Sequence, residues 1–253
     1  MIMRLKTAVC AGLLLFTIAS RAVELKIVRG DGQYPPYEMQ ENGALSGLHV
    51  DLINHIARQI GCTVTWQSVP WLRAQSMIRS GEADAITFMS RTPERETFAI
   101  FLDDNTLSVT RSALFVLAGN PRHVTWNQNL AGLEPYTIGV LRGYAYSPEF
   151  DQAASLKKMP VAATNEQLLQ MLHAGRFDLA VGDMDQFRYL SRHGKNMPAI
   201  EFLAPPLAAR PNYLAFSRAG HNAALARQFA ETLAAFKKTA RYTELVARYR
   251  QEE

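Results

Sequence analysis

Two polar segments of this chain each directly follow a stretch that the sequence predicts to be a buried strand. The first covers residues 90–95 and ends in Arg95, and the second covers residues 183–185 and begins with Asp183. Ligands of open α/β sheets bind beyond the carboxyl ends of the strands. A guanidinium is suited to binding a carboxylate through two parallel charge-assisted hydrogen bonds. Two such strand ends facing each other would form a cleft with an arginine on one wall and an aspartate on the other.

Both residues also have ordinary structural roles open to them. Arg95 lies three positions after Thr92, which is a good N-cap, and an arginine there is usually a solvated helix residue. Asp183 would itself cap a helix over residues 184–191, and this role is compatible with ligand binding. The six histidines form no i, i+4 pair and have no cysteine at metal spacing, so we expect no metal and no cofactor.

The elements that precede these two segments resemble each other. Residues 77–85 (MIRSGEADA) and 171–179 (MLHAGRFDL) each predict a helix end, a glycine stop, a turn and the start of a strand. The similarity favours two α/β lobes of similar build, although such a unit also recurs by chance in α/β proteins. Helices are further expected at 48–60, 70–80, 165–174 and 223–250 with a break near 239–242, and strands at 25–29, 63–67, 85–88, 138–141 and 178–181.

Two β-rich runs, residues 106–117 and 212–217, are the expected connections between the lobes. No linker rich in glycine and serine or in proline divides the chain, so continuous strands would have to join the lobes. The predicted organisation is a signal peptide at 1–22, lobe 1 at 23–115 and 206–253, and lobe 2 at 118–204.

The first 22 residues are typical of a secretory signal peptide. A basic start is followed by an apolar run over 7–19, which is shorter than the about 20 residues that span a bilayer, and by a small-x-small site ending at Ala22. This leader holds three basic residues and no acidic one, so its removal lowers the formal net charge from +4 to +1. The weak remaining charge argues against nucleic acid as a partner. Cys62 is the only cysteine outside the leader and is expected to be a buried thiol.

Six short motifs, taken in order, resemble the extracytoplasmic solute-binding proteins of family 3, the polar amino-acid type. They are YPPY (34–37), GALSGLHVD (43–51), GEAD (81–84), TPER (92–95), GVLRG (139–143) and DLAVGD (178–183). The resemblance implies an α/β, two-lobed periplasmic-binding-protein-like fold of type II, in which each lobe is a mixed sheet flanked by helices and the ligand cleft lies between them. The segment PWLRA (70–74) is similar to one branch of this family.

The resemblance also implies roles for single residues. Arg95 matches the arginine that binds a ligand's α-carboxylate, and Asp183 matches the acid that receives its α-ammonium. The other implied ligand-binding residues offer hydroxyl or backbone groups or aromatic walls: Thr87, Ser90, Tyr34, Tyr37, Trp71 and Tyr144. Asp31 sits where the family sometimes places an acid for a basic side chain, and Arg73 is more typical of a surface or lobe-bridging residue. The segment 143–145 (GYA) and Phe88 depart from the family, because both replace hydroxyl-bearing residues and make the cleft more aromatic.

The resemblance implies a monomeric periplasmic protein that binds an amino acid or a related carboxylate and delivers it to an inner-membrane ABC permease. One alternative is a periplasmic dehydratase that acts on prephenate-like acids on the same scaffold. Such an enzyme needs a buried acid of raised pKa beside the leaving hydroxyl, and no glutamate accompanies Asp183 on its predicted wall. The other alternative is a ligand-sensing module, but such modules usually continue into a membrane span, whereas this sequence stops at Glu253.

Overall fold

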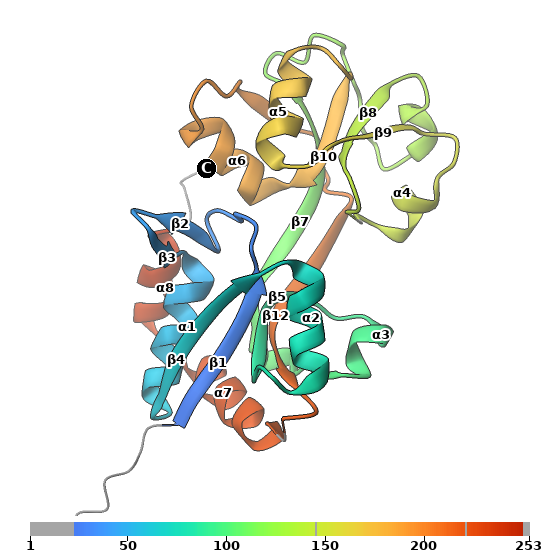
Figure 1. Ribbon diagram of the computed structural model, residues 1–253. Coiled ribbons are helices and arrows are strands. Elements are labelled where there is room, and N and C mark those ends of the chain that lie inside the picture. Colours follow the sequence, from blue (N-terminus) through green and yellow to red (C-terminus); the bar gives the residue numbers. More distant parts are fainter. Residues whose placement is uncertain (1–22, 145, 221, 250–253) are drawn as a thin grey trace, which may run out of the picture.

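The fold is known from a computed structural model, which describes residues 23–144, 146–220 and 222–249 (Figure 1). The predicted signal peptide, residues 1–22, lies outside the described residues. Within the described ranges, no helix is long and apolar enough to cross a membrane.

One curled, mixed sheet runs through both halves of the molecule. Its main path among the described residues follows the order β4-β1-β5-β12-β7-β10-β8-β9, while β6 pairs with β12 and β11 pairs with β7. The strands of this sheet are β1 (Val23–Gly30), β4 (Cys62–Val69), β5 (Ala85–Ser90), β6 (Ala99–Ile100), β7 (Thr106–Leu117), β8 (Thr137–Leu141), β9 (Lys157–Ala162), β10 (Leu179–Asp183), β11 (Ile200–Phe202) and β12 (Ala208–Ser217). A separate hairpin is formed by β2 (Met39–Glu41) and β3 (Ala44–Ser46).

Helices cover this sheet at both ends of the molecule (Figure 1). They are α1 (Leu48–Gln59), α2 (Trp71–Ser80), α3 (Pro93–Glu96), α4 (Pro148–Gln152), α5 (Asn165–His173), α6 (Met184–His193), α7 (Ala223–Phe236) and α8 (Ala240–Ala247), with short 3-10 turns at η1 (Asp103–Asn105) and η2 (Leu130–Leu133). Only β7 and β12 run as long strands from one group of helices to the other in the part of the chain that the structure describes (Figure 1).

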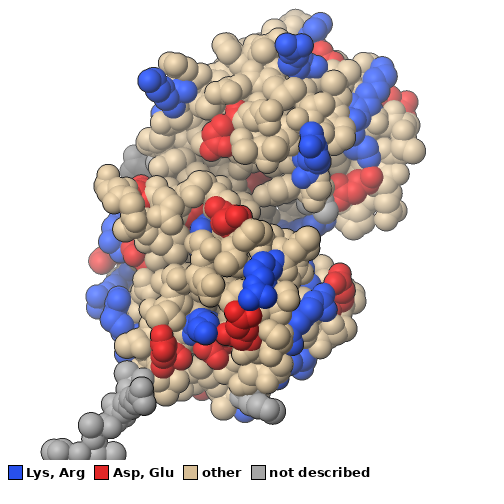
Figure 2. Space-filling model, viewed as in Figure 1, with Lys and Arg blue, Asp and Glu red and all other residues tan. Residues whose placement is uncertain are grey.

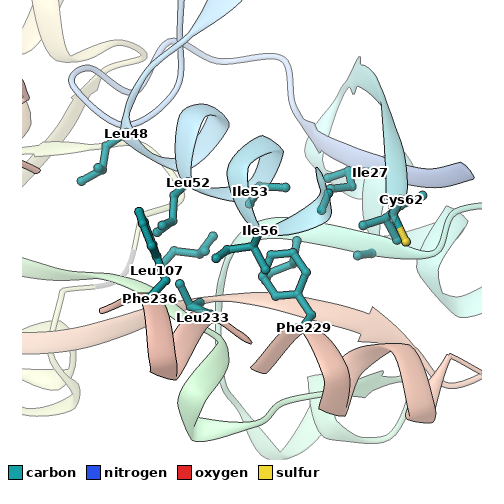
Figure 3. Packing of buried hydrophobic residues seen from close by; sticks show 14 of the residues in the cluster. Ile27, Leu48, Leu52, Ile53, Ile56, Cys62, Leu107, Phe229, Leu233 and Phe236 are labelled. Carbon is teal, nitrogen blue, oxygen red and sulfur yellow. The ribbon is translucent and has the colours of Figure 1, made fainter. Parts of the chain in front are cut away.

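The hydrophobic core divides into two regions that we call lobe 1 and lobe 2. In lobe 1, apolar side chains of α1 and α7 pack on the sheet, and Figure 3 shows Leu52 and Ile56 pointing towards Phe229 and Leu233. In lobe 2, the buried side chains come mainly from β7, β8, β10, α5 and α6. The predicted limits of the lobes, 23–115 with 206–253 and 118–204, stay a proposal.

Local capping signals position the two strand ends that carry Arg95 and Asp183. Gly81 ends α2 in the left-handed conformation, with φ of 77°, and the chain turns from there into β5. The hydroxyl of Thr92 accepts a hydrogen bond from the backbone N–H of Arg95, so the predicted N-cap is confirmed. Asp183 likewise caps α6. Both polar segments therefore lie at well-defined ends of strands.

The strand predicted over 212–217 begins four residues earlier, at Ala208. Pro211 is a reason to exclude these residues from a strand, because proline cannot donate to a ladder. In the structure, Pro211 lies opposite Val109 of β7, and the pairing with β5 begins one residue later, at Asn212. At Pro211, β12 is therefore not paired with β5, so a proline is tolerated at this position of the strand.

Candidate functional site

A cavity of about 420 Å³ lies between the lobes, and the space-filling view shows the surface hollowed there (Figure 2). This volume is in the range of small-molecule sites. Lobe 1 contributes the ends of β1 and β5, lobe 2 contributes the ends of β8 and β10, and β7 and β12 pass between them. The cavity is lined by Gly30, Tyr34, Glu38, Trp71, Phe88, Ser90, Thr92, Arg95, Thr110, Ser112, Leu141, Gly143, Tyr144, Tyr146, Asn165, Gly182, Asp183, Gln186, Arg210 and Asn212.

The structure brings six of the eight predicted ligand-binding residues to this cavity, namely Arg95, Asp183, Tyr34, Trp71, Ser90 and Tyr144. The other two, Tyr37 and Thr87, are buried but do not line it. The hydroxyl of Thr87 donates to the carboxylate of Glu38, and the hydroxyl of Tyr37 donates to Asp185.

Arg95 is held in place beside the cavity by its own lobe. Its Nη1 donates to the carbonyl oxygen of Ser90 at 2.8 Å, and its guanidinium carbon lies 5.5 Å from the centre of the Trp71 ring. Burial lowers the pKa of Arg95, and the nearby positive charge of Arg210 lowers it further, while Glu94 acts in the opposite direction. An arginine remains charged even so. A half-buried guanidinium of fixed orientation is thus available to an anion in the cavity.

Asp183 fills the capping role that the sequence predicted as the alternative to ligand binding, and it also lines the cavity. Its Oδ1 accepts a hydrogen bond from the backbone N–H of Gln186 at 2.8 Å, which is the helix cap. Its Oδ2 is buried and has no hydrogen-bond partner among the described residues. Burial raises the pKa of Asp183 to about 7, and the negative charge of Asp185 contributes to the rise. Oδ1 therefore caps α6, while Oδ2 has no hydrogen-bond donor among the described residues.

Aromatic rings form much of the remaining wall. The rings of Tyr34 and Phe88 stack at 5.1 Å between centres and 16° between planes. Burial raises the pKa of Tyr144, and the nearby Tyr34 adds to the rise, so the two residues lie close to each other in the cavity. A Cβ at Gly30 would lie 3.6 Å from both Trp71 and Tyr34, so the missing side chain there leaves room between the rings.

Phe88 has a backbone conformation that bulky residues seldom adopt. Its φ is 55°, and the pairing of β5 with β12 shifts register between Tyr213 and Ala215. Non-glycine residues in the left-handed region cluster at ligand sites, where the surrounding structure maintains the strain. The conformation supports the view that this strand end serves binding.

Glu38 is a cavity residue that the sequence analysis did not identify. Its Oε2 accepts from Nε of Arg29 at 2.9 Å, and its Oε1 accepts from Thr87 at 2.8 Å and contacts Nδ1 of His49 at 3.0 Å. Arg29 and Glu38 are each only 1% exposed. Burial alone would raise the pKa of Glu38, but His49 and Arg29 hold it below its usual range. Its negative charge is thus already compensated within lobe 1.

A second group of cavity residues that the sequence did not predict lies on β7 and β12, the strands that join the lobes. The Ser90 hydroxyl donates to Oδ1 of Asn212 at 3.1 Å, and Nδ2 of Asn212 donates to the hydroxyl of Thr110. Arg210 is two residues before Asn212 on β12, which places both side chains on the same face of the strand. Arg210 and Asn212 have the two-residue spacing of a strand in the sequence, but Pro211 lies between them and interrupts the strand pattern.

The described residues contain no group of three or more His, Cys, Asp or Glu side chains placed to hold a metal ion. The polar atoms of the cavity instead come from guanidinium, carboxylate, amide and hydroxyl groups. Such a set is able to bind both ends of a zwitterion.

A hydrogen bond across the cleft predicts a measurable effect on the opening of the lobes. The Tyr37 hydroxyl of lobe 1 donates to Oδ2 of Asp185 in lobe 2 at 2.5 Å. A hydrogen bond to a charged group contributes about 1.5–3 kcal/mol. We therefore expect Tyr37→Phe to shift the ligand-free protein towards an open form, with a larger radius of gyration in small-angle X-ray scattering.

The matched control is Tyr249→Phe, because the Tyr249 hydroxyl donates to Asp51 at 2.8 Å within lobe 1. It removes the same type of bond without crossing the cleft and should leave the radius of gyration unchanged. Equal radii for the two variants would mean that the bond between Tyr37 and Asp185 does not hold the lobes together.

Comparisons with known proteins agree on one family. The family model for bacterial extracellular solute-binding proteins, family 3, matches residues 27–252. The arginine-binding periplasmic protein of Mannheimia haemolytica is 24% identical over 238 residues, which cover 92% of this chain and 94% of that protein. Both the family and this relative are binding proteins and not enzymes, in agreement with the prediction.

Solved structures show the same architecture. A histidine kinase sensor domain with similarity to periplasmic binding proteins is 26% identical, has a TM-score of 0.69 and matches over 90% of this chain and 96% of its own. The probable amino-acid ABC transporter extracellular-binding protein of Bacillus subtilis is 13% identical, with a TM-score of 0.75 over 90% of this chain and 98% of its own. The second likeness concerns the fold alone, and the predicted type II fold is confirmed.

Proposed function

We propose that this chain, which belongs to family 3 of the bacterial extracellular solute-binding proteins, captures an amino acid in the cleft between its lobes. In this proposal Arg95 binds the α-carboxylate and Asp183 receives the α-ammonium. The observation that carries it is Asp183, which lines the same cavity as Arg95 and whose buried Oδ2 lacks a hydrogen-bond partner among the described residues.

The buried Oδ2 of Asp183 is costly as long as it has no hydrogen-bond donor. A buried polar atom without a partner destabilises the fold by about 1–3 kcal/mol, and by more when it is charged. An ammonium group in the cavity would supply both the hydrogen bond and the opposite charge. Arg95 would meet the carboxylate of the same ligand from the opposite lobe, so that binding one small zwitterion draws the two lobes together.

We further propose that the chain acts in the periplasm as a monomer and delivers its ligand to an inner-membrane ABC permease. Closure around a ligand gives a hinge-type protein two shapes, and a permease is able to distinguish them. The experiment is stimulation of permease ATPase activity by the liganded protein. Stimulation that does not depend on ligand would contradict delivery.

A sensory role is the second candidate, and the likeness to a histidine kinase sensor domain favours it. The same ligand-driven closure would then report to a kinase instead of a permease. Transport of the ligand that fails after deletion of the gene supports delivery, whereas unchanged transport with a lost transcriptional response supports sensing.

Ligand capture is tested by a thermal-shift screen across the amino acids and small organic acids. A ligand at 100 times its Kd stabilises the folded protein by about 2.7 kcal/mol, which such a screen detects. We expect an amino acid to raise the melting temperature more than the deaminated acid of the same carbon skeleton. The absence of a shift with every amino acid would overturn the proposal.

A further inference from the structure

We propose that the groove between α1 and α8 is a second ligand site, which binds a phosphate or sulfate group between Arg58 and Arg241. The two helices lie side by side in lobe 1 (Figure 1), and the groove between them has a volume of about 460 Å³. No described residue lines both this groove and the cavity between the lobes, so the inference goes beyond the proposed function and does not rest on it. The groove is lined by Asp51, His55, Arg58, Phe236, Arg241, Glu244, Leu245 and Arg248.

The groove has two ends of different chemistry. Near the start of α1, Asp51 accepts a hydrogen bond from the Tyr249 hydroxyl at 2.8 Å, and it contacts the guanidinium of Arg248 at 3.6 Å. At the other end lie Arg58 of α1 and Arg241 of α8, and neither guanidinium makes a hydrogen bond or an ion pair with the part of the chain that the structure describes. The carboxylate at one end is therefore engaged, while the two arginines at the other end have no carboxylate partner among the described residues.

The ring of His55 lies at the arginine end of the groove, and the charges there act on it. Burial lowers the pKa of His55, and the charges of Arg241 and Arg58 lower it further. The ring centre lies 4.2 Å from that of Phe236, and Nε2 of His55 lies 3.1 Å from Nε2 of Gln59. Both guanidinium groups thus act on one ring that its neighbours hold in place, and without an anion His55 is neutral at about pH 7.

A phosphate or sulfate group matches this end of the groove. A guanidinium binds such an oxyanion through two parallel charge-assisted hydrogen bonds. Arg58 and Arg241 belong to different helices, so one ion held by both would connect α1 with α8. A tetrahedral oxyanion presents acceptor oxygens in several directions, so both arginines and the ring of His55 are able to contact it at once.

The charge balance of the groove favours a dianion. Its three arginines exceed its two carboxylates, Asp51 and Glu244, by one charge, and by two once His55 is protonated. A bound dianion would stabilise the protonated ring, so the anion and the proton each strengthen the binding of the other. The affinity for the anion should therefore fall as the pH rises through the titration of His55.

The test is calorimetric titration of the full mature chain with sodium sulfate, because sulfate keeps its double charge at the pH values where histidine titrates. Sodium chloride keeps the ionic strength constant. We expect one sulfate to bind per chain, about tenfold more tightly at about pH 5.5 than at about pH 8. Sulfate should also raise the pKa of His55 in an NMR titration, in which the resonance is assigned by its loss in His55→Gln.

Arg58→Gln and Arg241→Gln should each weaken sulfate binding by about tenfold or more, because each removes one of the two forks. Arg227→Gln is the matched control, because Arg227 is exposed on α7, lines neither cavity and carries the same charge. It should leave the affinity for sulfate unchanged. None of these three residues lines the cavity between the lobes, so amino-acid binding should be that of the wild type in all three variants.

The inference is overturned if wild-type protein does not bind sulfate, if Arg227→Gln weakens binding as much as Arg241→Gln, or if sulfate leaves the pKa of His55 unchanged. The first and third measurements use the wild-type protein and decide the matter even if a variant does not fold. A protein that binds sulfate but no amino acid would count against the proposed function alone. Displacement of sulfate by inorganic phosphate but not by phosphatidylglycerol vesicles supports a free anion as the ligand, whereas displacement by both supports a lipid headgroup.

Discussion

Arg95→Ala is expected to weaken amino-acid binding by about 2–5 kcal/mol, which is roughly 30-fold to several thousand-fold in Kd. The guanidinium is half-buried and held by Ser90 at 2.8 Å, so its orientation is set before the ligand arrives. Its removal would leave the ligand carboxylate desolvated in an aromatic cavity without its charged partner. Calorimetry with the amino acid that stabilises the wild type most measures the effect.

The loss should appear in binding and not in folding. Arg95 makes one described side-chain hydrogen bond, which is only partly buried, to the carbonyl of Ser90, so the melting temperature of the ligand-free variant should stay within a few degrees of wild type. Arg73→Ala is the control, because Arg73 is 53% exposed and pairs with Glu82 outside the cavity. A loss smaller than threefold for Arg95→Ala, or equal losses for the two variants, would mean that Arg95 does not bind the carboxylate.

Features that depend on neighbouring residues could be predicted from the sequence. The caps at Thr92 and Asp183 and the helix stop at Gly81 follow from local backbone chemistry, and each has the expected geometry. The long strand over 106–117 has the predicted bounds, because this run contains several β-branched and aromatic residues and no glycine or proline. The wall positions of Arg95 and Asp183 follow from these elements.

Features that depend on residues far apart in the sequence could not be predicted. The partners of Glu38 are Arg29, Thr87 and His49, and no spacing rule places these on one carboxylate. At the start of α5, the Thr164 hydroxyl accepts from the backbone N–H of Gln167, but the Gln167 side chain accepts from the backbone N–H of Ala163 and not from that of Thr164, so the pair departs from the usual capping box. Strands as short as β6 and β11 carry too few residues for a periodicity to be recognised.

The binding role that we propose for Asp183 would come at the expense of stability. Its pKa in the folded protein is raised from 3.8 to about 7, mainly by burial. A carboxyl whose folded pKa is raised stabilises the fold most at pH below its unfolded pKa, and this contribution is lost as the pH rises towards 7. One pKa unit corresponds to about 1.4 kcal/mol, so the loss amounts to about 4 kcal/mol.

The ligand-free variant Asp183→Asn should therefore be more stable than wild type at pH 8 and of similar stability near pH 4. Asparagine keeps an oxygen for the Gln186 N–H and does not titrate. Thermal melts at both pH values measure the difference. If the difference in stability between wild type and Asp183→Asn were the same at pH 4 and pH 8, Asp183 would be either ionised at both pH values or solvated.

The same substitution separates an amino-acid binder from a binder of plain carboxylates. If Asp183 receives the α-ammonium, Asp183→Asn should lose affinity for the amino acid by about tenfold or more but not for its deaminated analogue, because an amide offers only a neutral acceptor. For the wild type, the affinity for the amino acid should also fall by about tenfold per pH unit below 7, as protonation of Asp183 competes with the ammonium. If Asp183 only caps α6, asparagine is nearly as good a cap, and neither ligand should respond. Titrations of both ligands against wild type and variant decide between the two roles, and unchanged affinity for both ligands would leave Arg95 as the only anchor and the protein as a carboxylate binder.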